Sequence, residues 1–300
     1  MINTSEKVGI TRHVPVLKEE AIGFLKIREN GTYFDGTLGQ GGHSSEILKS
    51  ISKKGKLVAV DRDADAIEYC NKHLFLKDNN FFGVKDSYHN INNVLRKLDI
   101  KSVDGILLDL GLSSHQLDKS NRGFSYKDNC DLDMRFDKSQ ELTAKDILNF
   151  SDTNELADII YKYGEERRSR IIAKNIARIR PVNKVNELLQ AITISTPPKN
   201  RKKSIARVFQ AIRISVNEEL EILAAFLSCF HNHLNTGGII AIISFHSLED
   251  RLVKQAFKKL EKESLLSIIT KKPLTPSFDE QRINIRSRSS KLRVAMKVSN

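Results

Sequence analysis

Short apolar runs alternate with stretches of helical periodicity over residues 1–109 of the chain. The runs are typical of buried strands, and apolar residues three or four apart in the intervening stretches indicate helices. The predicted strands are 32–35, 56–60, 81–84 and 104–109, and the predicted helices are 44–51, 64–73 and 90–98, with Ser44 as the N-cap of the first. Such alternation favours a parallel sheet whose strands are joined by right-handed crossovers.

This alternation stops after the fourth predicted strand. No strongly β-like run occurs between about 116 and 215, where Pro181, Pro197 and Pro198 separate helical stretches. The elements predicted from there on are helices at 143–149, 154–163, 165–180, 185–193 and 218–233, a turn at 235–238, and strands at 239–244 and 289–298. We therefore expect an α/β fold in which 1–115 and 216–300 form one domain, and 116–215 forms an inserted all-helical domain.

The composition is that of an ordinary globular protein, because 40% of residues are hydrophobic and 29% are charged. Cys70, Cys130 and Cys229 are far apart in the chain, so they form neither a disulfide framework nor a paired metal motif. Residues 1–11 lack the apolar core of a signal peptide, and the apolar run at 239–245 is too short to span a bilayer. We expect a cytoplasmic protein with no membrane partner.

The formal net charge of +12 favours a polyanionic partner, nucleic acid above all. In the predicted helix at 165–180 the basic residues are three or four apart and share one face, and isoleucines occupy another. The basic residues are Arg167, Arg170, Lys174 and Arg178, and the isoleucines are Ile172, Ile176 and Ile179. Such a basic face can bind phosphates, and the alternative is a solvated surface with no ligand. The same two readings hold for the basic segments 201–203 and 282–293.

A glycine-rich segment, 35–44, follows the first predicted strand. A loop of this kind suits the phosphates of ATP, the pyrophosphate of a dinucleotide, or the methionyl part of S-adenosylmethionine. The Gly-Lys-Ser/Thr ending of an ATP-binding loop is absent, and Ser44 stands at the third glycine position of the dinucleotide fingerprint. Asp35 would repel a pyrophosphate but can hold an ammonium group. The loop therefore predicts S-adenosylmethionine as the cofactor.

Acidic and aromatic residues follow the next two predicted strands. Asp61 ends the second strand, where adenosine-binding folds place a carboxylate for the ribose hydroxyls, roughly 20 residues after the loop. After the third strand, Asp86 can accept from an adenine amine and Tyr88 can pack on the ring. The alternative is that all three are strand-end or loop residues without a ligand.

The fourth predicted strand ends at Asp109, in the segment 109–118. Ligands of open α/β sheets lie beyond the carboxyl ends of the strands, so this segment should border the transferred methyl group. We hypothesise that Asp109, with Ser113 or Ser114, holds the N–H groups of an amine acceptor. His115 is either a base or a loop histidine without a role. His231 and His233 have poor geometry for one metal, and no metal site is predicted.

The sequence resembles the ribosomal RNA small-subunit methyltransferase H family in segments spread over nearly the whole chain and in the family's order. These segments are 13–17, 35–44, 104–118, 122–125, 132–135, 163–167, 209–213, 244–251 and 286–293. The departures are His115 and Ile285, each of which replaces a proline usual in the family. The resemblance implies a Rossmann-like class I methyltransferase sheet with the helical insertion after its fourth strand.

The resemblance also implies a function and a set of site residues. The family transfers a methyl group from S-adenosylmethionine to the exocyclic N4 amine of a cytidine in the decoding region of 16S ribosomal RNA. The partner is then small-subunit RNA or the 30S particle, and the family also allows a homodimer. The residues that the resemblance assigns to the cofactor are Gly41, Gly42, His43, Asp61, Tyr88, Asp109 and Gln116.

Two other functions stay open on the sequence. A nicotinamide-dependent oxidoreductase could use a similar sheet, although Asp35 and the missing third glycine oppose it. A non-catalytic ribosome assembly factor could bind RNA and retain only a cofactor pocket. Binding of S-adenosylmethionine against NAD would separate the first alternative from a methyltransferase, and methyl transfer to ribosomal particles would separate the second.

Overall fold

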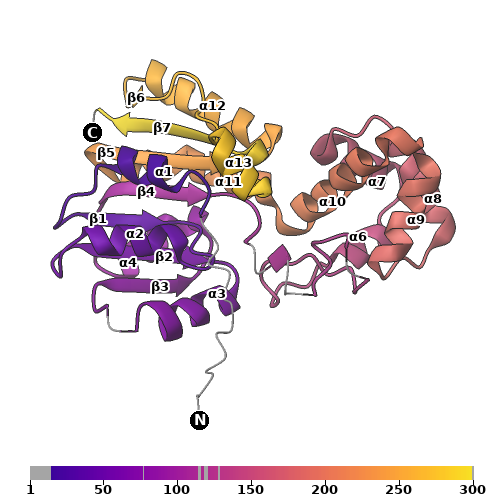
Figure 1. Cartoon of the computed structure of the whole chain (residues 1–300), viewed down its shortest axis with the longest axis horizontal. Coiled ribbons are helices and arrows are strands. Elements are labelled where there is room, and N and C mark those ends of the chain that lie inside the picture. The colour runs from indigo at the N-terminus through magenta and orange to yellow at the C-terminus, as the bar shows by residue number, and fades with distance from the viewer. Residues whose placement is uncertain (1–14, 77, 114–115, 118–120, 128, 299–300) are drawn as a thin grey trace, which may run out of the picture.

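The computed structural model describes residues 15–298 except 77, 114–115, 118–120 and 128. Its centre is a seven-stranded sheet in the order β3-β2-β1-β4-β5-β7-β6. The strands are β1 (Thr32–Asp35), β2 (Lys56–Asp61), β3 (Phe81–Lys85), β4 (Val103–Asp109), β5 (Leu234–Ser244), β6 (Leu266–Ile268) and β7 (Lys291–Lys297). Figure 1 shows this sheet on the left and a separate group of helices on the right. The predicted α/β class is confirmed.

The sheet is mixed. Strands β1 to β5 pair in parallel, as the alternation of strands and helices predicted, whereas β7 runs antiparallel to both β5 and β6. Strand β1 is hydrogen-bonded to β2 on one side and to β4 on the other. The crossovers therefore change direction between β1 and β4, which is the topological switch point where open α/β sheets bind ligands.

Both faces of the sheet are covered by helices, because alternate strand residues point to opposite sides. Phe34 and Ile106 pack in a cluster with α4 and α11, whereas Tyr33 and Leu107 pack with α1 and α2 on the other face. Full burial of a side chain of this size stabilises the fold by about 1.5–3 kcal/mol. The covering helices are α1 (Lys18–Leu25), α2 (Gly42–Ser50), α3 (Ala64–Tyr69), α4 (Ile91–Lys97), α11 (Glu219–Cys229) and α12 (Ser247–Lys262), whereas α13 (Phe278–Ile283) buries none of its residues.

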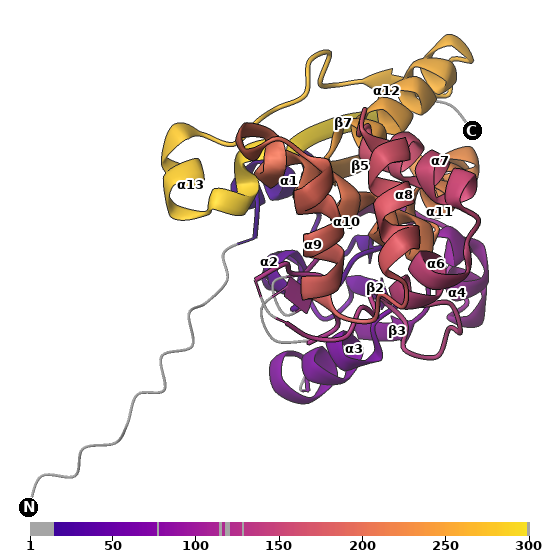
Figure 2. The same cartoon turned by 90° about the vertical axis from the view of Figure 1, so that its right-hand side faces the viewer.

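The remaining helices form a group with its own core. They are α6 (Ala144–Phe150), α7 (Thr153–Gly164), α8 (Ser169–Ile179), α9 (Val185–Ser195) and α10 (Arg201–Asn217). Leu148, Ile160, Ile172, Leu188 and Ile212 are buried together in this second core. Figure 2 shows these helices in front of the sheet. We refer to the group as the helical insertion; the predicted domain boundaries at 115 and 215 stay a prediction, and α10 runs two residues past the second.

Several predicted elements differ from the structure. The helix predicted at 64–73 is α-helical only to Tyr69 and is followed by a π-helical turn, Cys70–Leu74. Helix α2 begins at Gly42, so Ser44 lies inside it and is not its N-cap. The helix predicted at 165–180 begins only at Ser169, because Glu165 adopts a left-handed conformation with φ of 50° after α7. The turn predicted at 235–238 is part of β5, where a register shift against β4 absorbs Gly237 at φ of 80°. Helix α11 ends at Cys229, and the rest of the predicted helix, Phe230–His233, is a 3-10 turn.

No helix among the described residues combines the length and the apolar character needed to cross a membrane.

Candidate functional site

The loops that follow β1 and β4 lie against each other at the switch point. The backbone N–H of Gly36 donates to Leu107 O at 2.9 Å, and the N–H of Asp109 donates to Thr37 Oγ1 at 2.6 Å. The approach at Gly36 is close, because a Cβ there would lie 2.1 Å from Leu108 Cδ2. The segment after β1 and the segment after β4 therefore lie side by side, and the prediction that they share one ligand stays a prediction.

Asp35, at the end of β1, forms hydrogen bonds with residues at both ends of the glycine loop. Its side chain is 1% exposed and accepts from Ser44 Oγ at 2.6 Å and from Thr37 N–H at 3.0 Å. Burial raises the pKa of this carboxyl group, and the hydrogen bond from Ser44 works against that rise. Ser44, which was expected to cap the helix, thus joins the two ends of the loop. The predicted contact of Asp35 with a ligand ammonium stays a prediction.

Gly41 combines a left-handed backbone with little room for a side chain. It has φ of 73°, and a Cβ would lie 2.9 Å from Leu74 Cδ1 and 3.1 Å from Cys70 Sγ. Its N–H donates to Leu38 O at 2.7 Å and so closes the turn that precedes α2. The left-handed backbone and the crowding both favour glycine here.

Asp61 joins the glycine loop to the end of β2. One carboxylate oxygen accepts from Gly39 N–H at 2.8 Å, and the other accepts from Asp63 N–H at 2.8 Å. Burial raises the pKa of Asp61 to about 6, although these two hydrogen bonds lower it. Each oxygen has two lone pairs, so the carboxylate keeps acceptor capacity for hydroxyl groups.

Tyr88 lies after β3, beside the loop. Its ring makes an edge contact with Phe226 at 5.4 Å between centroids, and its Cβ lies 2.8 Å from where a Cβ on Gly36 would be. Burial raises the pKa of its phenol. The neighbouring Asp86 accepts from Ser87 N–H and from Asn90 Nδ2, each at 2.7 Å, so this carboxylate shapes its own turn.

His43 and Asp109 face each other at the switch point. His43 Nε2 lies 3.5 Å from Asp109 Oδ2, and the histidine side chain is 6% exposed. Neither ring nitrogen of His43, nor Asp109 Oδ1, makes a hydrogen bond within the described residues. Buried polar groups in native proteins are almost always hydrogen-bonded, so these three atoms are candidates for contact with a polar ligand.

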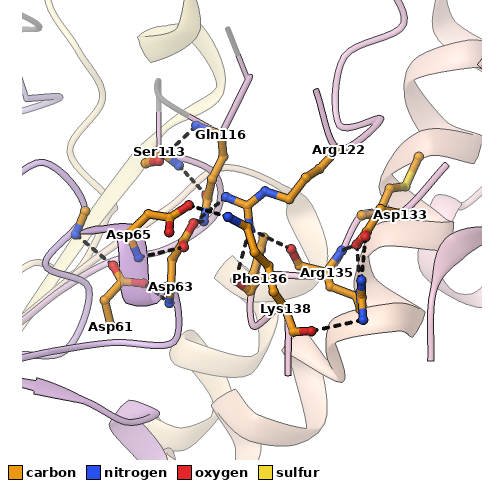
Figure 3. A network of polar contacts seen from close by, with 12 residues as sticks. Asp61, Asp63, Asp65, Ser113, Gln116, Arg122, Asp133, Arg135, Phe136 and Lys138 are labelled. Carbon is orange, nitrogen blue, oxygen red and sulfur yellow. Dashed lines mark hydrogen bonds and ion pairs between the residues drawn. The ribbon is translucent and has the colours of Figure 1, made fainter. Parts of the chain in front are cut away.

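Gln116 is the centre of the next group of contacts. Its Oε1 accepts from Ser113 N–H at 3.0 Å, and its Nε2 donates to Asp63 Oδ2 at 3.1 Å. Arg122 pairs with the same Asp63 oxygen, and both partners of this ion pair are buried (Figure 3). The sequence assigned no role to Asp63 or to Arg122. The one available signal was that Arg122 opens the family-like segment 122–125.

One further cluster has donor atoms close enough for a metal. Atoms of Glu219, His246 and Glu249 lie within 4.8 Å of one another. However, Arg213 bonds both oxygens of Glu219, at 2.8 and 2.9 Å, and Glu249 Oε2 accepts from Phe245 N–H at 2.8 Å. With the guanidinium as counter-ion, we interpret the cluster as a buried salt-bridge network that joins α10 to α12.

Several residues that the sequence singled out lie away from this site or outside the described residues. Ser114 and His115, offered as an amine acceptor and as a base, lie outside the described residues. Arg170, Lys174 and Arg178 lie exposed on α8 as predicted, whereas Arg167 precedes the helix. Of the isoleucines, Ile172 and Ile176 are fully buried.

Comparisons with known proteins agree over nearly the full length. The model of the MraW methylase family matches residues 10–298. Ribosomal RNA small subunit methyltransferase H of Clostridium botulinum (strain Kyoto / Type A2) is 46% identical over 308 residues, covering 96% of this chain and 99% of the relative. The protein of the same name from Halothermothrix orenii is 44% identical over 309 residues, with the same coverage. A solved rRNA methylase structure from Streptococcus thermophilus has a TM-score of 0.42 and 11% identity, and the match covers 94% of each chain.

Proposed function

The chain belongs to the MraW methylase family, and on this basis we propose that it transfers a methyl group from S-adenosylmethionine to the N4 amine of a cytidine in the decoding region of 16S ribosomal RNA. The observation that carries the proposal is the set of buried atoms of His43 and Asp109 that make no hydrogen bond within the described residues at the switch point. Ligands of this fold lie there, and a methyl donor and an amine acceptor must meet there.

The residues present fit the cofactor. The predicted contacts Gly41, Gly42 and His43 surround the turn into α2, and Asp61 keeps acceptor capacity for ribose hydroxyls. Of the remaining predicted contacts, Tyr88 follows β3, Asp109 ends β4 and Gln116 follows it, at the same edge of the sheet. When bound, S-adenosylmethionine supplies an already activated methyl group, so the protein's task is alignment.

The acceptor amine is a weak nucleophile because its lone pair is delocalised into the cytosine ring. We propose that Asp109 and Ser113 hold the amine so that its nitrogen lies in line with the methyl group. Alignment of this kind can lower a barrier by about 7–11 kcal/mol. The Asp109 backbone is fixed by the hydrogen bond to Thr37, and the Ser113 Oγ accepts from Gln116 N–H at 3.2 Å. The base must leave its stack to enter such a site.

Affinity for the cofactor is expected to fall about tenfold between pH 8 and pH 5. With a pKa of about 6, Asp61 is mostly protonated at pH 5 and then accepts ribose hydroxyls poorly. The free energy of unfolding should change with pH in the opposite direction. The folded protein holds this proton more tightly than the unfolded chain, whose aspartates have a pKa of about 3.9, so the contribution of Asp61 to stability declines as pH rises from about 4 to 6.

Titration calorimetry from pH 5 to pH 8, with thermal unfolding at each pH, separates these two effects. An Asp61→Asn variant is the control, because it binds more weakly and should lose this pH dependence. An unchanged pH profile in Asp61→Asn would show that another group is responsible.

The exposed face of α8 is our proposed RNA surface. Arg170, Lys174 and Arg178 are spaced along one side of the helix, and none has an acidic partner among the described residues. The buried face of the same helix, with Ile172 and Ile176, holds it on the insertion core. The overall charge of +12 supports a polyanionic substrate.

Neutralising Arg170, Lys174 and Arg178 together to glutamine is expected to reduce the salt dependence of RNA binding. Each phosphate contact contributes a slope of roughly 0.7–0.9 in log affinity against log salt, so three lost contacts should lower the slope by about 2–3. The measurement is affinity for the small subunit between 50 and 200 mM salt. The matched control replaces Lys254, Lys258 and Lys262, which are also exposed and lie on α12. Equal losses in both triple variants would contradict a surface specific to α8.

Methyl transfer from labelled S-adenosylmethionine tests the proposed activity directly. Purified 30S particles and free 16S RNA, both from cells that lack this protein, are incubated with the chain, and the labelled nucleoside is identified by mass spectrometry. We expect N4-methylcytidine at one site in the decoding region. Cofactor binding without any transfer would favour the non-catalytic assembly factor, and label on another nucleotide would overturn the assignment of the acceptor.

A further inference from the structure

Arg122 connects the helical insertion to the half of the molecule that holds the predicted cofactor contacts. Its side chain is buried, with 5% of the residue exposed. One end of the guanidinium pairs with Asp63, just after β2, and the other donates to the carbonyls of Arg135 and Phe136 at 3.0 and 3.2 Å. Figure 3 shows Arg122 between these two groups.

Asp63 is in turn connected to the glycine loop through Asp61. Its N–H donates to one oxygen of Asp61, whose other oxygen accepts from Gly39 N–H, both at 2.8 Å. The Asp63 Oδ1 also accepts from Asp65 N–H at 3.2 Å and so caps α3. A shift of the Asp63 backbone or carboxylate would therefore move the loop that the glycines form.

The Asp63 carboxylate also contacts the segment after β4, which is proposed to hold the methyl-accepting amine. Asp63 Oδ2 receives Gln116 Nε2 at 3.1 Å beside the guanidinium of Arg122. Gln116 Oε1 in turn accepts from the N–H of Ser113, our proposed amine-holding residue, at 3.0 Å. Two donors from the chain after β4 thus converge on one buried carboxylate.

A second connection holds the insertion independently of Arg122. Arg62 donates to the carbonyl of Asn217 at 2.6 Å, and Asn217 Oδ1 accepts from Phe136 N–H at 2.7 Å. Asn217 Nδ2 also donates to Met134 O at 2.7 Å. The loop around Phe136 therefore stays attached when Arg122 is replaced, so a variant of Arg122 is expected to fold.

We propose that Arg122 is a positioning residue through which RNA bound on the insertion and cofactor bound in the loop strengthen each other. The inference rests on the proposed function, because it names what couples the two substrates of that reaction. Phe136 packs on the insertion core that also holds the buried face of α8. The carbonyls at 135 and 136 hold Arg122, and Arg122 holds Asp63 between the two binding sites. Coupling of this kind is reciprocal, since each ligand changes the affinity for the other by the same factor.

The test compares Arg122→Met with Arg135→Met in the full chain. Arg135 lies in the same segment and also pairs with an aspartate, Asp133, but the hydrogen bonds of its side chain stay within residues 133–140. Calorimetry gives the Kd of S-adenosylmethionine, and the affinity of 30S particles is then measured with and without saturating cofactor. We expect the native chain to bind particles more tightly with cofactor. In Arg122→Met, cofactor affinity should fall about tenfold and the effect of cofactor on particle affinity should vanish.

Arg135→Met should leave cofactor affinity and coupling within twofold of the native chain, even if its unfolding temperature falls. Arg122→Lys keeps a charge beside Asp63 but lacks the planar fork that also reaches two carbonyls, so it should retain only part of the coupling. If Arg122→Met does not fold, Arg122→Lys decides the matter, and native coupling in that variant would overturn the inference.

Coupling that survives Arg122→Met, or that Arg135→Met abolishes equally, would also overturn it. Failure of the proposed function looks different. In that case the native chain itself would bind no S-adenosylmethionine or transfer no methyl group, whereas failure of the inference alone leaves a native enzyme whose coupling ignores Arg122.

Discussion

An Asp109→Asn variant is expected to transfer methyl groups about 10²–10³-fold more slowly than the native chain while keeping its fold. The amide retains the size of the side chain but replaces one acceptor oxygen by a donor, so it cannot align two N–H groups of an amine equally well. Asp109 Oδ1 has no hydrogen-bond partner among the described residues, so replacing this oxygen by an NH2 group breaks no hydrogen bond there. Single-turnover transfer from labelled cofactor to 30S particles measures the loss.

The matched control for this variant is Asp104→Asn on the same strand. Asp104 accepts from Thr32 N–H at 2.9 Å and from Asn235 Nδ2 at 3.0 Å, near the opposite end of β4. Its replacement should lower stability with little effect on the rate of transfer. If Asp109→Asn keeps full turnover and unchanged cofactor affinity, Asp109 does not hold the amine. A parallel loss of rate in Asp104→Asn would point to the stability of β4 instead.

The second large effect is expected from Gly41→Ala, which should weaken cofactor binding by at least 10²-fold. An alanine at φ of 73° has a backbone cost of roughly 1–2 kcal/mol, and the crowding by Leu74 and Cys70 adds roughly 1–3 kcal/mol. Relief of this strain requires the turn before α2 to move, and the turn carries the predicted contacts Gly42 and His43. Calorimetric titration with S-adenosylmethionine gives the change in affinity.

Gly23→Ala serves as the control for Gly41→Ala. Gly23 lies within α1, and nothing lies within 4 Å of where its Cβ would be. Alanine favours the helix over glycine by roughly 0.5–1 kcal/mol, so this variant should bind cofactor normally and unfold at a slightly higher temperature. Native cofactor affinity in Gly41→Ala would mean that the glycine loop does not contact the cofactor.

The four N-terminal strands, and the edge of the sheet at which their carboxyl ends meet, could be predicted from the sequence because each strand is a short apolar run that ends on a polar residue. Asp35, Asp61 and Asp109 sit at the ends of β1, β2 and β4, and parallel strands bring such ends to one edge. The resemblance to a known family then assigned Gln116, which spacing alone did not single out. Whether these residues contact the cofactor stays a prediction.

Helix α10 was not predicted, although it has 17 residues. It begins with Arg201, Lys202 and Lys203, and positive charge in a first turn opposes the helix dipole and resembles no start signal. Two prolines just before it suggested a break. What stabilises α10 is burial of residues such as Phe209 and Ile212 against the other insertion helices, and those partners are distant in sequence.

The Arg122–Asp63 pair was beyond sequence reasoning for a similar reason. Fifty-nine positions separate the two residues, and many arginines in a basic chain could have been the partner of a given aspartate. The choice depends on how the segment after β4 folds back over the end of β2. Neither the periodicity nor the spacing of residues in the sequence indicates that these two segments meet.

The two separate hydrophobic cores have a consequence for how the molecule tolerates change. Because the insertion core and the sheet cores are distinct clusters, a destabilising substitution in one need not disturb the packing of the other. The insertion helices can then unfold locally while the sheet stays folded, and amide hydrogen exchange would detect this as faster exchange in the helices than in the strands. The part proposed to read RNA is thus free to diverge in sequence, provided that the polar contacts of Arg62 and Arg122 at the boundary are kept.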